Sequence, residues 1–381
     1  MSNTSYTNIC VDDSVINVAR NVIQQQATCE AFFICDVRDL EYKVRLWRRE
    51  MPNVTPFFAV KCCTDLVVLR TLNSLGVNFD CSNKVEIETV MQLGVSPERI
   101  IFAHPIKSVE HLNYAKRNNV TLMTFDSADE LDKIKDKNAR FHIGAAFKHP
   151  TVFQRTIEDA KAVFDVGREL GFKMDTLDIG GGFPGGARKL DSFVELCHVI
   201  RDAIDTNFPP SSCINIIAEP GQFFVMSAYT LITKVVGIKK NFMTVEGKFC
   251  EHHNVYINES KCNTINRDLF ELMDIHISPL EAPVNRPRDI LTTIWGATCH
   301  PWDMIVCRSH FFAVSDGEWL VFDNMGAYTL VQASGFNGFG FPRVHYIAST
   351  ACFPFVELAV VSTRVRSGYG HLERALEPRP L

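Results

Sequence analysis

The sequence lacks the segments that would place it in a membrane or in an oxidising compartment. It has no C-x-x-C pair, and its 13 cysteines are an odd number for a fully paired disulfide framework. Residues 1–14 are polar and acidic, unlike a secretory signal. Residues 222–238 come closest to an apolar run that crosses a bilayer, but Lys234 interrupts them. We therefore expect a cytoplasmic protein with reduced thiols and no membrane partner.

An excess of positive charge is also absent. The 39 Lys and Arg residues against 44 Asp and Glu residues give a net charge of -5. This balance offers no electrostatic footprint for nucleic acid, so we expect no nucleic-acid partner. Hydrophobic residues make up 46% of the chain and charged residues 22%, which is typical of a globular protein with a sizeable core. A chain of 381 residues is long enough for two domains.

The first half of the chain alternates strand and helix patterns, which is typical of a parallel α/β architecture. The strand candidates are Pro56–Lys61, Val77–Cys81, Arg99–Ala103, Thr121–Phe125, Arg140–Gly144, Asp175–Ile179 and Ile214–Ala218. Closure of a (β/α) barrel takes eight strands, so this count is one short. The shortage lies between Phe125 and Phe141, where only one short helix intervenes. A missing strand would leave a gap or an unpaired edge.

The texture changes after Pro220, where apolar and polar residues alternate without a helical period. This pattern predicts a β-rich second domain from about Gln222. We predict a barrel domain over residues 37–221 and a β domain over residues 222–350, which the N-terminal strand 31–36 joins. Residues 351–381 form a variable C-terminal tail.

Pro56–Lys61 is an apolar run that ends in a lysine. The pattern predicts a buried strand, then an N-cap at Thr64 and a helix with leucines at helical spacing until Gly76. A lysine buried at a strand end is costly unless something neutralises it or reacts with it. This position faces the catalytic mouth of a barrel. Taken alone, a lysine that reaches to solvent is the commoner explanation.

Two later strand ends carry glycine and acid. Gly180, Gly181 and Gly182 are successive, so their backbone N–H groups can approach a phosphate closely. A glycine-rich surface turn is the alternative for this segment. Glu219 closes the next strand, where a buried carboxylate would hold a ring nitrogen protonated. A helix cap or a salt bridge is the alternative for this acid.

Other motifs gain meaning only in combination. His142 lies on a strand candidate, where a core histidine is the commoner case. Trp295–His300 and Asn324–Tyr328 each combine a glycine turn with a reactive or hydrogen-bonding side chain. A lysine at one strand end, a glycine nest, an acid and a stackable ring together predict a site for pyridoxal 5'-phosphate (PLP). The lysine would form a Schiff base with this cofactor.

The chain resembles the eukaryotic ornithine decarboxylases, an alanine-racemase-like family of PLP-dependent decarboxylases that also contains antizyme inhibitors. The motifs that carry the resemblance are PFFAVKC from Pro56, FDCSNKVEIE from Phe79, SPERIIFAHP from Ser96, LDIGGGFPG from Leu177, IIAEPG from Ile216, WGATC from Trp295, NMGAYT from Asn324 and FNGF from Phe336. The resemblance implies a (β/α)8-type barrel with a C-terminal β domain. It also implies a cytoplasmic homodimer with active sites at its interface, which decarboxylates ornithine to putrescine in polyamine biosynthesis.

The resemblance also implies roles for single residues. Lys61 would be the Schiff-base lysine and Glu219 the partner of the pyridine nitrogen. Cys299 would come from the partner subunit and act as the catalytic proton donor. The other cofactor contacts would be Asp80, His142, Gly181, Gly182, Gly221 and Tyr328, and the substrate contacts would be Glu271, His300 and Phe336.

The chain departs from the family pattern where phosphate is bound. A Gly-Ser-Gly loop of the family reads Gly144-Ala145-Ala146 here, and the arginine after the EPG motif is Gln222. A charge-assisted hydrogen bond contributes about 1.5–3 kcal/mol, so we expect these losses to weaken cofactor binding by about two to four decades.

Recognition of the distal amine and the barrel itself also differ. The family's tyrosine–aspartate pair is Phe270-Glu271, and the acid after the active cysteine is His300. Residues 259–262, Glu-Ser-Lys-Cys, replace a segment rich in glycine and tyrosine. About fifty residues with one βα unit and an arginine near the cofactor are absent before Phe141, which explains the count of seven strands.

These departures leave a second reading open, a non-catalytic regulator that resembles antizyme inhibitors. The antizyme-binding region of vertebrate relatives corresponds to Val109–Lys133, which includes the basic residues Lys116, Arg117 and Lys133. Lys135 and Lys137 lie just beyond it. An ordinary solvated helix face is the commoner explanation of such a run.

Overall fold

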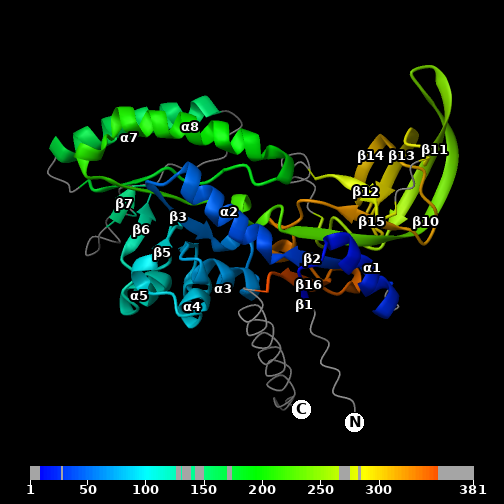
Figure 1. The fold of residues 1–381 in the computed structure, drawn as a ribbon, viewed down its shortest axis with the longest axis horizontal. Coiled ribbons are helices and arrows are strands. Elements are labelled where there is room, and N and C mark those ends of the chain that lie inside the picture. The colour runs from blue at the N-terminus through cyan, green and yellow to red at the C-terminus, as the bar shows by residue number, and fades with distance from the viewer. Residues whose placement is uncertain are drawn as a thin grey trace, which may run out of the picture.

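The computed structural model describes residues 9–26, 29–125, 130, 139–141, 150–169, 174–265, 275–281 and 285–350. These residues form a curled parallel sheet with helices and a second, mostly antiparallel sheet (Figure 1). The barrel-plus-β-domain prediction for the fold is confirmed. The chain passes from one sheet to the other between residues 218 and 229, and the domain boundaries at 37, 222 and 351 stay a prediction.

Seven parallel strands form the first sheet. They are β3 (Val54–Ala59), β4 (Asn78–Cys81), β5 (Ile100–Phe102), β6 (Leu122–Phe125), β7 (Ala139–Phe141), β8 (Thr176–Asp178) and β9 (Asn215–Ala218). Their order is β7-β6-β5-β4-β3-β9-β8, so each of the seven predicted strands has a counterpart. The first ends at Ala59 and not at Lys61, and residues 142–144 of the fifth lie outside the described part of the chain. β7 pairs with β6, and β7 and β8 lie beside each other at the two ends of the ladder. Within the described residues, β7 and β8 contact each other at the two ends of the sheet without pairing in one ladder.

Helices surround this sheet. They are α2 (Val37–Glu50), α3 (Leu66–Ser74), α4 (Lys84–Gln92), α5 (Val109–Arg117), α7 (Pro150–Glu169), α8 (Leu190–Asn207) and the short α9 (Gln222–Val225), whereas α1 (Val15–Gln26) packs on β2 of the second sheet. Single 3-10 turns are η1 (Val60–Cys62), η2 (Pro97–Arg99), η3 (Ala187–Lys189), η4 (Pro210–Ser212), η5 (Leu330–Gln332) and η6 (Phe336–Gly338). In Figure 1, α7 and α8 lie side by side on one side of the sheet, and α3, α4 and α5 lie on the other. Within the described part of the chain, every helix is too short or too polar to cross a bilayer.

Helix starts follow local capping chemistry. Asn83 caps α4 by accepting a hydrogen bond from the Glu86 N–H at 3.0 Å, and the Glu86 carboxylate accepts one from the Ser82 N–H at 2.7 Å. The predicted cap at Thr64 of α3 is wrong by one residue. Asp65 caps this helix, since its carboxylate accepts the Val67 N–H at 2.8 Å.

Nine strands form the second sheet. They are β1 (Ile9–Val11), β2 (Phe32–Asp36), β10 (Tyr229–Val245), β11 (Lys248–Ile257), β12 (Ile277–Pro279), β13 (Ile290–Trp295), β14 (Met304–Phe311), β15 (Trp319–Phe322) and β16 (Arg343–Ala348). The main order is β1-β16-β2-β10-β11-β13-β14, and β15 pairs with both β10 and β12. The predicted N-terminal strand thus joins this sheet as β2.

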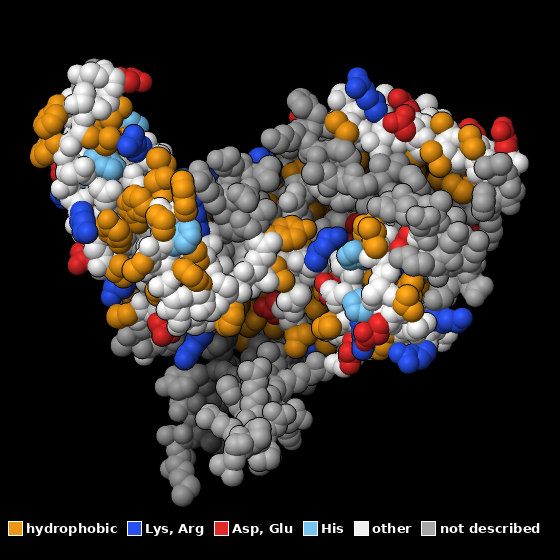
Figure 2. Space-filling model, turned by 180° about the vertical axis from the view of Figure 1, so that it is seen from behind, with side chains coloured by type: hydrophobic (Ala, Val, Ile, Leu, Met, Phe, Trp, Pro, Cys, Tyr) orange, Lys and Arg blue, Asp and Glu red, His pale blue; other side chains and the backbone are white. Residues whose placement is uncertain are grey.

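The β10–β11 hairpin projects from the body of the molecule (Figure 1). Glu246 and Gly247 form its two-residue turn, and both have the positive φ angles, 49° and 79°, of the tight turns that suit a twisted hairpin. Hydrophobic side chains gather on the projecting part (Figure 2). Phe242 and Phe249 stack there with ring centroids 5.1 Å apart, and both remain exposed.

Candidate active site

Lys61 lies where strands β3 and β4 end together. Ala59 of β3 is in register with Asp80 of β4, and the η1 turn then carries Lys61 over the strand ends. The Lys61 side chain is 44% exposed and not buried as the strand pattern suggested, and its Nζ is 3.4 Å from the Oδ2 of Asp80, whose side chain is fully buried. Burial by itself lowers the pKa of Lys61, but the carboxylates of Asp80, Glu219 and Glu86 raise the pKa above its ordinary value.

Glu219 stands at the end of the neighbouring strand β9, which pairs with β3. Its side chain is buried, and burial raises the pKa of the carboxyl well above its ordinary range. The negative charges of Asp178 and Asp80 raise this pKa further, while Lys61 lowers it. A second positive charge near this buried carboxyl would stabilise its ionised form and so lower its pKa.

Close backbone packing joins the glycine segments to the lysine turn. The Glu219 N–H donates to the Gly180 carbonyl at 2.7 Å, and a Cβ on Gly181 would lie 2.7 Å from the Glu219 carbonyl oxygen. A Cβ on Gly221 would lie 3.0 Å from the Cys62 Cβ. Gly182 has a φ of 86°, which favours glycine. The structure thus brings the predicted glycines, Glu219 and Lys61 to one place.

A buried cation and an aromatic cluster support the glycine loop from behind. Lys43 of α2 is fully buried, and its Nζ donates to the carbonyls of Gly185 and, at 3.2 Å, Phe223. Burial lowers the pKa of Lys43 to about 8, although Asp39 opposes this. The Trp47 ring lies 4.8 Å from the Phe183 ring and 5.5 Å from the Phe223 ring, centroid to centroid. These contacts fix the loop against α2 and α9.

A segment of the second sheet closes over the lysine turn. The Tyr328 N–H donates to the Cys62 carbonyl at 3.0 Å, with Tyr328 in the left-handed region at a φ of 55°. Burial, together with Cys62 and Asp80, raises the pKa of the Tyr328 hydroxyl. The Asn324 Oδ1 accepts the Ala187 N–H at 3.3 Å, just past the glycine loop. Tyr328 therefore belongs to the same group as Lys61.

Gln222 opens α9 directly after Gly221. Its side-chain amide donates to the Phe183 carbonyl at 3.2 Å, so it is bound to the glycine loop. The amide carries no charge, and this end of the site thus lacks the arginine of the family pattern.

The other predicted residues form a second group on the β domain. Cys299 and His300 are exposed, and the His300 ring lies edge-on to Phe336 with centroids 6.1 Å apart. Phe336 is also exposed. His142 and Glu271 lie outside the described residues. The sequence analysis assigned no role to two residues near this site. Lys43 lies in a helix rich in charged residues, which predicts a solvated side chain, and Asp178 lies in the LDIGGGFPG motif.

Glu259 opens the segment that replaces the family's glycine-rich stretch, and it is buried. Burial raises the pKa of its carboxyl to about 7, against hydrogen bonds from Ser260, Asn263 and Thr264 that lower it. The Ser260 N–H donates to the Glu259 Oε1 at 2.8 Å. The folded protein therefore holds a proton here that the unfolded chain releases near pH 4.5.

We predict that the stability of Glu259→Gln, relative to that of the wild type, increases as the pH rises. Between pH 4.5 and about 7 the folded wild type binds more protons than the unfolded chain, so its stability falls with rising pH. Glutamine does not titrate, and the free energy of unfolding of the variant relative to wild type should rise by up to about 3 kcal/mol between pH 5 and 8. Urea unfolding at both pH values measures this, with exposed Glu88→Gln on α4 as control. A difference independent of pH would contradict it.

Comparison with known proteins agrees with this geometry. The family model described as "Pyridoxal-dependent decarboxylase, pyridoxal binding domain" matches residues 37–140 and 139–226. The two matched segments meet in β7, where the missing residues were expected. PLP is therefore the cofactor of this fold.

Whole-chain relatives extend the match into the second sheet. Rat ornithine decarboxylase is 34% identical over 88% of this chain and 85% of its own length. Antizyme inhibitor 2 of Xenopus laevis is 34% identical over 89% of this chain and 85% of its own length. The crystal structure of the arginine decarboxylase of Paramecium bursaria Chlorella virus, bound to agmatine, has a TM-score of 0.78 at 29% identity, covering 87% of this chain and 100% of that one. The chain thus belongs to the family of pyridoxal-dependent decarboxylases that includes the ornithine decarboxylases and the antizyme inhibitors.

Proposed function

We propose that this protein decarboxylates a basic amino acid with PLP, and that ornithine, which yields putrescine, is the substrate. The observation that carries the proposal is the Lys61 amine at the strand ends, 3.4 Å from buried Asp80 and within the field of Glu219. A relative named ornithine decarboxylase and a structural relative named arginine decarboxylase support a basic substrate. His300 in place of an acid leaves recognition of the distal amine weaker than in the family pattern.

The residues present fit PLP. Gly181 and Gly221 pack so closely on Glu219 and Cys62 that a Cβ would clash, and Gly180 and Gly182 have positive φ angles. A glycine loop of this kind can present successive backbone N–H groups to a phosphate. Lys61 offers the amine for covalent attachment. Glu219 offers a carboxyl with a raised pKa, and a protonated ring nitrogen beside it would lower that pKa towards its ordinary value. When bound, the cofactor supplies the electron sink for the pair left behind by departing carbon dioxide. Asp80 would orient the Lys61 amine throughout.

Cys299 would act from a second copy of the chain. Its Sγ would return a proton to the carbon that lost its carboxylate, and His300 and Phe336 would border the substrate. These residues share the β domain with the exposed aromatic residues Trp302 and Phe341. Such exposed rings support a homodimer with active sites at its interface.

The test of the proposal begins with the visible absorbance of the purified protein with added PLP, before and after borohydride reduction. Mass mapping should place the reduced cofactor on Lys61. Release of carbon dioxide is then measured with ornithine, lysine and arginine. A band that reduces onto Lys61, with turnover of at least one substrate, is the expected result. Bound cofactor without turnover of any basic amino acid would overturn the decarboxylase proposal.

Arginine at position 222 should restore the missing phosphate contact. Gln222 heads α9 beside the glycine loop, so a guanidinium there would add a charge-assisted hydrogen bond. We expect Gln222→Arg to tighten PLP binding by about ten- to a hundredfold, corresponding to about 1.5–3 kcal/mol. A PLP titration measures the Kd, with Gln92→Arg at an exposed position of α4 as the charge-matched control. An equal gain in both variants would contradict a local contact.

A non-catalytic regulator that binds antizyme is the second candidate, supported by Gln222 and by the likeness to antizyme inhibitor 2. Helix α5 presents Lys116 and Arg117 on its exposed face, while Lys133 lies outside the described residues. A pull-down with antizyme separates the candidates. Antizyme binding by a protein that takes up no cofactor would favour the regulator.

A further inference from the structure

One buried carboxylate organises the loop that carries Cys299. Asp303 is 1% exposed and lies at the end of the connection between β13 and β14. Its Oδ2 accepts hydrogen bonds from the Thr298 N–H at 2.9 Å and the Thr298 hydroxyl at 2.5 Å. The residue immediately before Cys299 is thus fixed by both its backbone and its side chain.

The same carboxylate also holds a second loop. The Ser260 hydroxyl donates to the Asp303 Oδ2 at 2.9 Å, and the Lys261 N–H donates to the Oδ1 at 2.9 Å. Both residues belong to the 259–262 segment that departs from the family pattern. Asp303 therefore ties this segment to the Cys299 loop through four neutral donors, three on Oδ2 and one on Oδ1, so both oxygens of this buried acid are hydrogen-bonded.

The backbone closes the loop around this carboxylate. The Gly296 N–H donates to the Asp303 carbonyl at 2.7 Å, and the Asp303 N–H donates to the His300 carbonyl at 3.0 Å. A Cβ on Gly296 would lie 2.2 Å from the Asp303 Oδ1, so only glycine fits there. Cys299 therefore stands in a loop in which Gly296, Thr298 and His300 are all hydrogen-bonded to Asp303, the residue that ends it.

We propose that Asp303 is a positioning residue for Cys299, holding its thiol in the orientation needed for proton delivery in the partner subunit's site. The catalytic part of this inference rests on the proposed function. An acceptor-only carboxylate suits four donors, whereas an amide presents an NH2 group that cannot accept. Asp303→Asn should therefore loosen the loop although the side chain keeps its shape.

The experiment compares wild type, Asp303→Asn and the exposed control Asp316→Asn. Hydrogen exchange followed by mass spectrometry should lose at least about tenfold protection in the peptides that span 296–303 and 259–262. In the holoenzyme, kcat should fall at least about tenfold with KM and the reduction of PLP onto Lys61 unchanged. Loss of protection with unchanged kcat would overturn the proposal, because the loop would then be structural only. Unchanged protection would overturn it as well.

Two donor-removing variants and the alkylation rate of Cys299 test the same role of Asp303. Should Asp303→Asn fail to fold, Thr298→Val and Ser260→Ala each remove one donor and should shift exchange and kcat in the same direction by less. Should the wild type show no turnover, the readout is the rate at which iodoacetamide alkylates Cys299 relative to exposed Cys307 in the same molecule. Loosening of the loop should raise this ratio at least about threefold. A ratio that Asp303→Asn leaves unchanged would refute the positioning role without reference to decarboxylation.

Discussion

Replacement of Lys61 by alanine is expected to abolish borohydride-stable attachment of PLP and to lower the rate of carbon dioxide release by about a thousandfold or more. The Lys61 amine is the group that the strand ends, Asp80 and the η1 turn hold at the mouth of the barrel. Alanine removes both the nucleophile and the charge that faces Asp80. Absorbance, mass mapping and turnover on the same preparation measure the effect.

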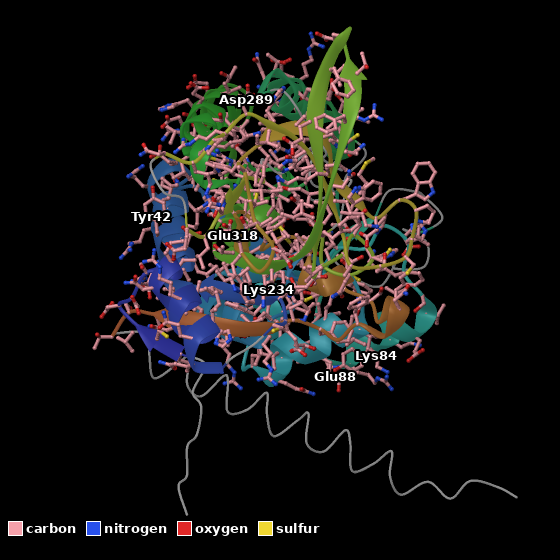
Figure 3. All side chains as sticks on the ribbon, turned by 90° about the vertical axis from the view of Figure 1, so that its right-hand side faces the viewer. Tyr42, Lys84, Glu88, Lys234, Asp289 and Glu318 are labelled. Atoms are coloured by element: carbon pink, nitrogen blue, oxygen red, sulfur yellow. The ribbon has the colours of Figure 1, made fainter. Side chains whose placement is uncertain are left out.

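Two controls separate chemistry from electrostatics. Lys61→Arg keeps a positive charge next to Asp80 but cannot form the covalent link, so it should be nearly as inactive as the alanine variant. Lys84→Ala changes a lysine at the surface of α4 (Figure 3), whose Nζ lies 3.0 Å from Glu110, and it should behave as wild type. A reducible cofactor band that persists in Lys61→Ala would show that another amine carries the cofactor.

The strands and most helices could be predicted because their signals are local. Asn83 and Glu86 form a capping box that is readable from four consecutive residues. The cap of α3 is Asp65 and not the expected Thr64, and Asp65 also has long-range partners. Its Oδ2 accepts the hydroxyls of Tyr229 at 2.7 Å and Tyr346 at 2.8 Å, both from the second sheet. A tertiary contact of this kind leaves no trace near residue 65 of the sequence.

The site also contains residues that local sequence signals predict and residues that only tertiary contacts reveal. Lys61, Glu219 and the glycines follow from strand ends and motifs, and the structure gathers them. Lys43 could not be predicted, because α2 is rich in charged residues and only the packing of Phe223 and Gly185 shows that this lysine is buried. The role of Asp303 could not be predicted either, because its donors come from two segments about forty positions apart in the chain.

Glu219→Gln is expected to act in opposite directions on the apoprotein and on the enzyme. Burial and the charges of Asp178 and Asp80 raise the pKa of Glu219, so the folded apoprotein favours the protonated acid. Above the ordinary pKa of a glutamate, 4.5, the unfolded chain has released this proton, and the stability of the wild type falls as the pH rises through the folded pKa. Glutamine resembles the protonated acid, and the variant apoprotein should gain stability over wild type with rising pH.

With PLP bound, Glu219→Gln should be worse than the wild type. A carboxylate can hold the ring nitrogen protonated, whereas a neutral amide cannot, so carbon dioxide release by Glu219→Gln should fall by about a hundredfold or more. PLP should also raise the Tm of the wild type by more than that of the variant, because only the wild type gains an ion pair. Glu88→Gln, on α4 in Figure 3, is the exposed control and should change neither quantity. A variant with wild-type turnover would show that Glu219 does not face the ring nitrogen, whatever its effect on the stability of the apoprotein.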